Sequence, residues 1–279
     1  MGKVIMIMVD GLRYDTACMQ MGYLHHLVEK NLAARFLVKT ELPAVSRPMY
    51  EVLLTGTAPY VSGITSNDIV RLSKQKSIFH LAREKGLKTA AAAYYFISQL
   101  YNHVPYDIVG DREQKDEDNA IQFGKFYFDD SYPDSHLMID GEILRSAYDP
   151  DFLLIHPMGM DYVGHLFGPD SKAYRKQAIE LDRWFARFVP GWMENDYHIV
   201  ITADHGMNSD GLHQGISPDE RHVPLFTISS AFQPGCYREE VPQLAIAPMV
   251  CKLLNLEPAG EMSTYDISEG LERGTQNPI

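Results

Sequence analysis

The chain has 279 residues, of which 45% are hydrophobic and 22% charged, and it carries a formal net charge of −12. This composition is typical of a soluble globular protein with a large core, and the length fits one large domain. The negative charge argues against a groove for a nucleic-acid polymer, because no stretch rich in lysine and arginine would neutralise the phosphates. These numbers leave the oligomeric state open.

The cysteines and the N-terminal segment bear on the compartment. Cys18, Cys236 and Cys251 lie far apart without a C-x-x-C spacing. Such a sparse, odd set is typical of a reducing compartment and argues against a disulfide framework or a thiolate zinc site. The first apolar run ends at the acidic Asp10, too early for a signal peptide or a membrane span. We therefore expect a cytoplasmic protein without a membrane span, although a chain trimmed of its leader would look the same.

Apolar runs of strand length alternate with segments of helical periodicity, which predicts an α/β fold with a mostly parallel sheet. The expected strands are Val4–Val9, Thr89–Tyr94, Phe152–His156, His198–Thr202 and Leu225–Ser229. The clearest expected helix runs from about Ser171 to Val189, where an apolar stripe repeats every three or four residues. A closing helix is expected over Val241–Leu254.

One shift in composition lies at about 110–135, where acidic residues cluster. We expect a surface excursion there, and the alternative is a small lid or cap over a site. No repeat, low-complexity tract or linker divides the chain, so residues 1–279 are expected to form a single domain.

Asp10 follows the first apolar run and precedes Gly11, which places its carboxylate at the carboxyl end of a buried strand. In open α/β sheets, ligands bind at this edge. The alternative is a helix N-cap, a position that aspartate also favours.

Ser46 precedes a helix-like run over residues 50–55, where serine commonly serves as an N-cap. As a nucleophile it would need activation, because a free alcohol reacts poorly at neutral pH. No histidine or lysine lies beside it in the sequence, so coordination to a metal is the better account of activation. A helix N-terminus would also favour an incoming anionic oxygen.

Two Asp–His pairs follow. Asp161 and His165 are four residues apart, so both would lie on one face of a helical turn, and the alternative is an exposed ion pair. Asp204 and His205 directly follow an apolar run, where each would be a desolvated polar group in need of a partner. Carboxylates and imidazoles together suit zinc, manganese or related dications.

His213 and His222 compete for the last ligand position. His213 lies in a loop between glycines, which can aim an imidazole freely, whereas His222 directly precedes an expected strand. We favour His213. Three aspartates, three histidines and one hydroxyl then suit two adjacent divalent metals with a nucleophile between them, a centre for in-line displacement at phosphorus.

Together these motifs resemble the alkaline phosphatase superfamily, in particular its nucleotide pyrophosphatase/phosphodiesterase-like branch. Their order is Asp, nucleophile, Asp-x-x-x-His, Asp-His and His, from VDGLRYD through ADHGM to HVPLF. The resemblance implies an alkaline phosphatase-like three-layer α/β/α sandwich and two divalent metals, zinc or alternatively manganese. It assigns Asp161, His165 and His213 to one metal, and Asp10, Asp204, His205 and the Ser46 oxygen to the other.

The segment around the nucleophile is the most discriminating. In the family, Thr or Ser stands two residues before a Pro, and a Thr-Gly pair follows downstream, as do Ser46, Pro48, Thr55 and Gly56 here. The stretch APYVSGITSN resembles the family's P-x-x-x-G-I-x-x-N. The resemblance therefore makes Asn67 the residue that hydrogen-bonds a non-bridging phosphate oxygen.

Other branches of the superfamily fit less well. Sulfatases carry an Arg where this chain has Tyr50, and cofactor-independent phosphoglycerate mutases need an inserted domain for which the chain is too short. Phosphoethanolamine-transferring members carry a Gly-x-His upstream of a Pro-Leu strand, as does DGLHQGISPDERHVPLF here, which supports His213.

The expected activity is that of a two-metal phosphodiesterase-type hydrolase acting on a small-molecule phosphoester. Ser46 would attack phosphorus and form a phosphoserine that is then hydrolysed. The alternatives are a phosphomonoesterase, a phosphonate hydrolase, or a phosphoryl transferase or mutase of the same superfamily, with a sulfatase or a metal-stabilised binding protein less favoured. Tyr94, Tyr95 and Phe96 either stack on a base or, the favoured interpretation, end a core strand.

Overall fold

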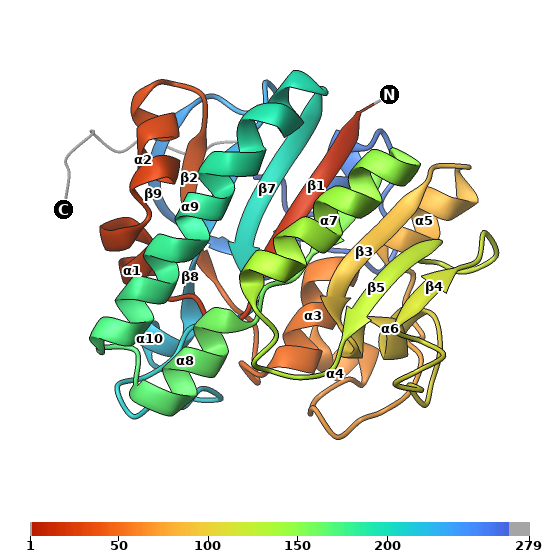
Figure 1. The fold of residues 1–279 in the computed structure, drawn as a ribbon, viewed down its shortest axis with the longest axis horizontal. Helices are drawn as coiled ribbons and strands as arrows, with labels where there is room; N and C mark the ends of the chain where they lie inside the picture. The colour runs from red at the N-terminus through yellow and green to blue at the C-terminus, as the bar shows by residue number, and fades with distance from the viewer. Residues whose placement is uncertain (1, 268–279) are drawn as a thin grey trace.

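The computed structural model describes residues 2–267. Its centre is a sheet of nine strands in the order β4-β5-β3-β6-β1-β7-β8-β2-β9 (Figure 1). The five strands from β5 to β7 in this order are mutually parallel, whereas β4 and β8 pair antiparallel with their neighbours. The strands are β1 Lys3–Val9, β2 Ala34–Lys39, β3 Thr89–Tyr94, β4 Glu113–Lys115, β5 Phe123–Tyr127, β6 Phe152–Ile155, β7 Tyr197–Ala203, β8 His222–Ile228 and β9 Gly235–Pro242.

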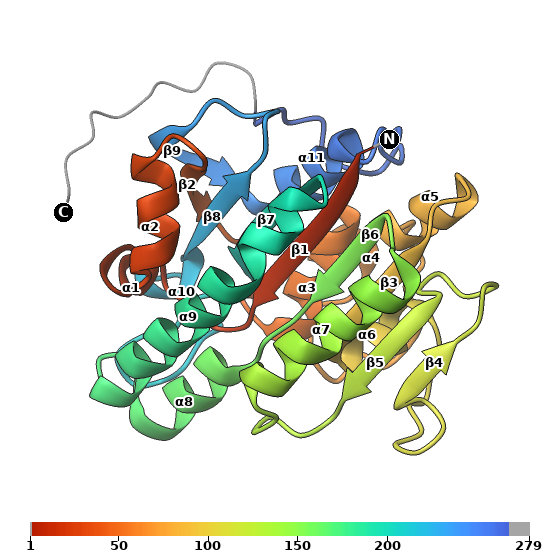
Figure 2. The same cartoon turned by 45° about the horizontal axis from the view of Figure 1, so that its top comes forward.

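Helices cover both faces of this sheet, which confirms the expected α/β fold with a mostly parallel central sheet (Figure 2). One face carries α1 Tyr14–Gln20, α2 Gly22–Glu29, α7 Asp134–Tyr148, α8 Gly159–Phe167 and α9 Lys172–Glu194. The other face carries α3 Ser46–Thr55, α5 Ile78–Glu84, α6 Phe96–Tyr101, η1 Gln243–Ala245 and α11 Ile246–Leu253. Two one-turn helices, α4 Pro59–Ser62 and α10 Pro218–Arg221, lie in connecting segments.

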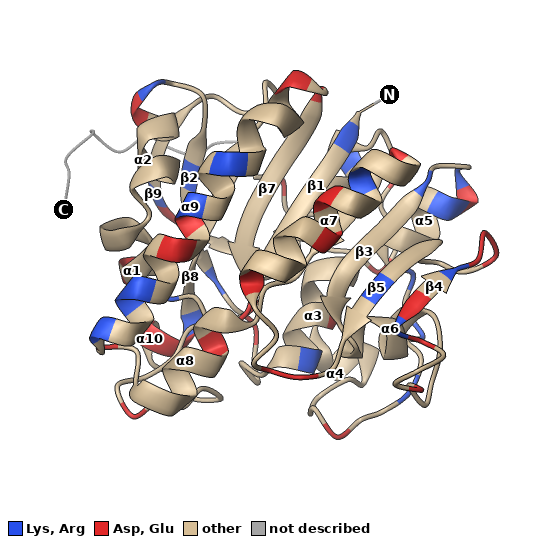
Figure 3. Ribbon diagram, in the orientation of Figure 1, with Lys and Arg blue, Asp and Glu red and all other residues tan. Residues whose placement is uncertain are grey.

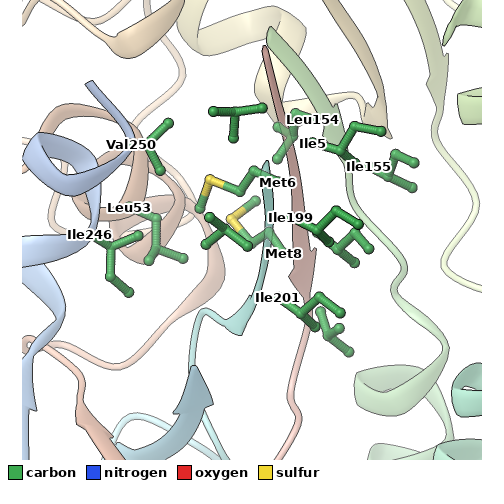
Figure 4. Packing of buried hydrophobic residues seen from close by; sticks show 14 of the residues in the cluster. Ile5, Met6, Met8, Leu53, Leu154, Ile155, Ile199, Ile201, Ile246 and Val250 are labelled. Carbon is green, nitrogen blue, oxygen red and sulfur yellow. The ribbon is translucent and has the colours of Figure 1, made fainter. Parts of the chain in front are cut away.

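The core is built around β1, whose residues from Val4 to Val9 are fully buried. Successive side chains of a strand point to opposite faces. Met6 and Met8 accordingly point toward Leu53 of α3 and Ile246 of α11 (Figure 4). Charged residues lie mainly on the helices and connecting segments, and the middle of β1 and β7 carries none (Figure 3).

The five expected strands all form, with ends that differ by at most three residues. The helix expected from Ser171 begins at Lys172, with the Ser171 hydroxyl accepting the backbone N–H of Tyr174 at 3.1 Å as its N-cap, and it continues to Glu194. The start of the helix expected over Val241–Leu254 was wrong. Val241 instead pairs with Val38 at the end of β9, and α11 begins only at Ile246.

The segment of about 110–135, expected as a surface excursion or lid, lies partly in the sheet. It supplies β4 and β5, and β5 pairs in parallel with β3 along its full length. The exposed residues are Glu113 and Lys115 of β4 and the turns around the strands, among them residues 116–118 and 128–131. Throughout residues 2–267, the helices are too short or too polar to cross a membrane.

Candidate metal centre

The expected ligands gather at the carboxyl edge of the parallel strands. Asp10 directly follows β1, and Asp204 and His205 directly follow β7, which lies beside β1 in the same direction. Three residues separate the end of β6 from helix α8, which carries Asp161 and His165. Parallel strands end at the same edge of a sheet. Four of these side chains therefore meet, although they are up to 195 positions apart in the sequence: Asp10, Asp161, Asp204 and His205.

The turn after β1 packs directly on α8. The backbone N–H of Asp161 donates to the carbonyl of Asp10 at 3.1 Å. Gly11 between them has a φ of +70°, and a Cβ at this position would lie 2.8 Å from the Cα of Asp161. Only glycine combines this backbone conformation with so close an approach. It therefore holds the carboxylates of Asp10 and Asp161 in one site.

Two overlapping groups of side chains could each hold a metal ion. Asp10, Asp204 and His205 form the first group, and each offers one ligand atom within 4.8 Å of the others. Asp161, His205 and His213 form the second group by the same measure. His165 adjoins the second group, with its Nε2 lying 3.3 Å from Oδ1 of Asp161. The resemblance divided the ligands in the same way, except that His205 here reaches both groups.

Each of the three histidines has one ring nitrogen engaged by a backbone carbonyl. Nδ1 of His165 lies 2.7 Å from the carbonyl oxygen of Gly211, Nδ1 of His205 lies 3.0 Å from that of Gly206, and Nδ1 of His213 lies 2.9 Å from that of Ala44. A carbonyl only accepts, so each Nδ1 carries the hydrogen and each Nε2 keeps its lone pair. This orientation is typical of metal-bound histidines.

The carboxylates also leave oxygens without partners at this point. Oδ1 of Asp10, Oδ1 of Asp161 and Oδ2 of Asp204 are buried and accept no hydrogen bond from the residues that the structure describes. Each instead faces a histidine Nε2, at 3.5 Å from His205 for Asp10 and 3.2 Å from His205 for Asp204. Buried carboxylate oxygens without partners are costly, and a bound cation removes that cost. The residues present therefore fit divalent metal ions.

The pKa values of Asp204, Asp10 and His213 point the same way, whereas the adjacent carboxylate of Asp161 raises the pKa of His165 to about 9. Burial raises the pKa of Asp204 well above its usual range, and the nearby charge of Asp10 raises it further. Burial alone would raise the pKa of Asp10 as well, but hydrogen bonding and the charges of His156 and His205 outweigh it and hold the value at about 2. Burial and the charge of His205 lower the pKa of His213 to about 4, so His213 is neutral at pH 7 and its Nε2 can coordinate.

Ser46 is the first residue of α3, and Val45 takes the N-cap position without a capping side chain. The structure therefore does not place Ser46 as an N-cap. Its hydroxyl is largely buried and lies 3.4 Å from Nε2 of His205, the histidine that both groups of ligands share. In the first turn of α3 only the backbone N–H of Ser46 can serve an anion at this point, because Pro48 has no N–H and that of Arg47 donates to Oδ1 of Asn67.

His213 and His222 lie in different surroundings. The His213 ring stacks on that of His205, with 3.8 Å between the ring centres, and its Nε2 is 3.8 Å from Oδ1 of Asp161. His222 begins β8, and its Nε2 lies 2.9 Å from Oε1 of Glu240 on β9. The structure thus brings His213 into the cluster and leaves His222 outside it.

Two residues of the site were missed from the sequence. The Tyr50 hydroxyl donates a short hydrogen bond to Oδ2 of Asp10, and Nε2 of His156 lies 3.4 Å from the same oxygen. The backbone N–H of Tyr94 donates to Nδ1 of His156 at 3.3 Å, so Nε2 of His156 carries the hydrogen and lies near Asp10 without a well-aligned hydrogen bond in residues 2–267. Both side chains are fully buried.

The sequence positions of Tyr50 and His156 could have identified both residues as part of the site. Tyr50 lies four residues after Ser46, on the same face of α3, and His156 directly follows the apolar run of β6 as Asp10 follows that of β1. Together they occupy Oδ2 of Asp10 and leave Oδ1 free toward His205.

Asn67 lies beside the nucleophile. Its side-chain Oδ1 accepts the backbone N–H of Arg47, the residue after Ser46, at 2.9 Å. An amide whose oxygen is held in this way keeps its NH2 group as a free donor on the other side.

The aromatic residues Tyr94, Tyr95 and Phe96 end β3 and begin α6. Their ring centres lie 4.6–4.8 Å apart, and all three side chains are half-buried. They pack on one another at the end of a core strand.

Comparisons with known proteins agree with this architecture. Residues 4–222 match the family described as type I phosphodiesterase/nucleotide pyrophosphatase. Among curated proteins, the chain is 26% identical over 269 residues to the human GPI ethanolamine phosphate transferase 2, catalytic subunit, and 27% identical over 274 residues to the GPI ethanolamine phosphate transferase 2 of Candida albicans. Both alignments cover 91% of this chain but only 26% and 30% of those proteins. The chain thus spans about a quarter to a third of their length.

Among solved structures, the chain resembles murine ectonucleotide pyrophosphatase/phosphodiesterase 5, in an inactive variant in complex with AMP. The TM-score is 0.77 at 14% identity, covering 98% of this chain and 100% of that one. The human counterpart gives a TM-score of 0.75 at 14% identity, covering 96% and 99%. At such identities the likeness shows a shared fold. Because the family match extends over most of the chain, this protein belongs to the type I phosphodiesterase/nucleotide pyrophosphatase family of the alkaline phosphatase superfamily.

Proposed function

We propose that this protein is a metal-dependent phosphoester hydrolase of the phosphodiesterase type, acting on a small-molecule substrate. Family membership supports an enzyme that acts on phosphoesters. One observation carries the finer proposal: buried carboxylate oxygens without partners and histidine Nε2 atoms converge beside the hydroxyl of Ser46. A nucleophile held at the N-terminus of a helix and beside metal ligands suits in-line displacement at phosphorus.

We propose zinc as the metal, with manganese as the alternative, at two adjacent positions. Asp10, Asp204, His205 and the Ser46 oxygen would hold one ion, and Asp161, His165 and His213 the other. Bound dications would neutralise charge on the phosphoryl oxygens and favour the ionised form of the serine hydroxyl. Zinc and manganese both accept such mixed carboxylate and imidazole ligands.

In the proposed reaction, Oγ of Ser46 attacks phosphorus opposite the leaving oxygen. The bond between Oγ and phosphorus forms, the bond to the leaving alcohol breaks, and the serine proton passes to solvent while the alkoxide takes one up. Water then attacks the phosphoserine, which frees Ser46 and releases the phosphate product. The NH2 group of Asn67 and the backbone N–H of Ser46 would donate to the non-bridging oxygens.

The charges near the nucleophile support a diester over a monoester. Two dications would exceed the charge of three aspartates by one positive charge, and the ionised Ser46 oxygen would cancel it, so no excess positive charge remains for the second charge of a monoester. The guanidinium nearest to Ser46 in sequence, that of Arg47, is buried and donates to Asn67 and Gln99. It therefore adds no exposed cation for the second charge of a monoester.

Replacing the nucleophile tests this proposal. Ser46→Ala should abolish nearly all turnover of bis-p-nitrophenyl phosphate while the protein still binds metal, because six of the seven ligands remain. The chelated wild-type enzyme should recover activity with zinc or manganese, and it should prefer the diester to p-nitrophenyl phosphate. Full turnover in the Ser46→Ala variant would remove Ser46 from the mechanism.

A transferase is the second candidate, and the names of the curated relatives favour it. Several are GPI ethanolamine phosphate transferases, at 22–27% identity. The same phosphoserine could pass its phosphoryl group to an alcohol in place of water. Product analysis with an added alcohol acceptor separates the two, because transfer yields a new phosphodiester or monoester of the acceptor and hydrolysis does not.

A further inference from the structure

Arg47 is a buried cation without an acidic partner among residues 2–267. Its side chain is 1% exposed, and it forms no ion pair there. Nη1 is buried and has no hydrogen-bond partner within the described part of the chain. Burying an unpaired charge costs free energy of folding. A buried guanidinium beside the nucleophile therefore indicates a function that offsets this cost.

The guanidinium is nevertheless held firmly. Its plane lies over the ring of Phe96, at 3.8 Å from the ring centre. Nη2 donates to Oε1 of Gln99 at 2.7 Å, and Nε donates to the backbone carbonyl of Asn67 at 2.9 Å. These contacts come from α6 and from the segment that follows α4, so Arg47 joins α3 to both. A planar fork of donors suits such an arrangement better than the single ammonium of lysine.

Two bonds from Arg47 converge on Asn67. The backbone N–H of Arg47 donates to Oδ1 of Asn67, and Nε donates to its carbonyl oxygen. The backbone bond occupies one of the N–H groups that the first turn of α3 leaves unpaired. Because both bonds hold the acceptor side of Asn67, its NH2 group is the part left free beside Ser46.

We propose that Arg47 is a positioning residue, which fixes the amide of Asn67 as a donor to a non-bridging phosphoryl oxygen beside Ser46. This inference rests on the proposed function, because it assigns Asn67 a role in phosphoryl transfer. Nη1 is enclosed by protein, so Arg47 acts through Asn67 and does not contact the substrate. Its side chain holds the backbone of Asn67, and its backbone holds the amide.

A double-mutant cycle tests this assignment. Arg47→Met keeps the backbone bond to Oδ1 but removes the Nε and Nη2 bonds, and Asn67→Ala removes the donor itself. Loss of one donor to a developing oxyanion costs about 100-fold or more in kcat, so Asn67→Ala should show about this loss. Arg47→Met should lose about 10-fold or more in kcat with little change in metal content. The double variant should lose no more than Asn67→Ala alone.

Glu51→Gln is the matched control on the same helix. Glu51 is fully buried and accepts hydrogen bonds from Ser73 and Tyr101, away from Asn67, so this change perturbs α3 without touching the amide. It should leave kcat unchanged. If the losses of the two single variants multiply in the double variant, or if Glu51→Gln lowers kcat as much as Arg47→Met, Arg47 does not act through Asn67.

Arg47→Lys covers the case in which the methionine variant does not fold. It keeps the charge and reaches only one of the two acceptors, so its kcat should fall between those of wild type and Asn67→Ala. An unchanged kcat in this variant would overturn the inference. Absence of turnover in wild type with zinc or manganese would instead count against the proposed function, which keeps the two failures apart.

Discussion

Removing the Tyr50 hydroxyl should weaken metal binding without disturbing the fold. Tyr50→Phe deletes the donor to Oδ2 of Asp10 but keeps a ring of the same shape, packed edge-on against His156 with 4.6 Å between ring centres. The lost bond is to an ionised group, and bonds of this kind contribute about 1.5–3 kcal/mol. Divided by RT, this corresponds to about 10- to 100-fold in the dissociation constant of the metal, the usual cost of losing a partner of a metal ligand.

The loss should fall on one metal position. Tyr50 contacts Asp10, so the ion held with Asp204 and His205 should bind more weakly, whereas the ion held by Asp161, His165 and His213 should bind nearly as in wild type. Competition with a chromophoric zinc chelator, carried out at a fixed pH, resolves the two dissociation constants.

Tyr101→Phe is the matched control for this experiment. Tyr101 is also a buried tyrosine whose hydroxyl donates to a carboxylate, that of Glu51 at 2.8 Å, but it lies on α6 away from the ligands. Its loss should lower stability and leave both metal affinities unchanged. Equal metal affinities in wild type and Tyr50→Phe would show that the bond to Asp10 does not support the metal site.

Three further predictions concern stability and the loop of His213. Burial raises the pKa of Asp134 to about 6, above 3.8 in the unfolded chain, so its contribution to stability is present below pH 3.8 and is lost as the pH rises through 6. Asp134→Asn should therefore gain up to about 2–3 kcal/mol relative to wild type between pH 4 and pH 8 in urea titrations, and an unchanged pH profile would contradict this. Glu220 accepts hydrogen bonds from Asn208, Gly215 and Ser217 around the loop of His213. Glu220→Ala should therefore lower the affinity for the metal ion at His213 about 10-fold in the same chelator competition. An unchanged affinity would contradict this. Leu154→Ala in the fully buried β6 should cost about 2–5 kcal/mol by urea unfolding, and a cost below 1 kcal/mol would mean that the core closes around the gap.

The strands that the sequence predicted are those buried on both faces. Continuous apolar runs such as that of β1 are distinctive, because a strand buried on both faces needs an apolar side chain at nearly every position. The strands that were missed lie toward the edges of the sheet. In β9 the run from Arg238 to Glu240 is exposed, and β4 has only three residues. Their composition does not identify them as strands. They are strands because they form hydrogen bonds with a neighbouring strand.

The candidate site, like the fold, could be predicted from the sequence only in part. The sequence by itself determined which residues could be ligands, because acidic and imidazole side chains directly after apolar runs have few structural explanations. It also determined that they meet, since parallel strands end at one edge of a sheet. It favoured His213 over His222 from the glycine-flanked loop but kept both as alternatives, because both follow Asp204 within 18 positions.

Only the tertiary structure decided which atoms face the centre. Carbonyls from distant segments hold Nδ1 of His165 and His213, and Tyr50 and His156 occupy one oxygen of Asp10, which leaves the other free. Arg47 showed no role in the sequence and became visible only through its bonds to Asn67, 20 positions away. The physical reason is that sequence spacing fixes where a side chain starts, whereas hydrogen bonds between remote segments fix where its polar atoms point.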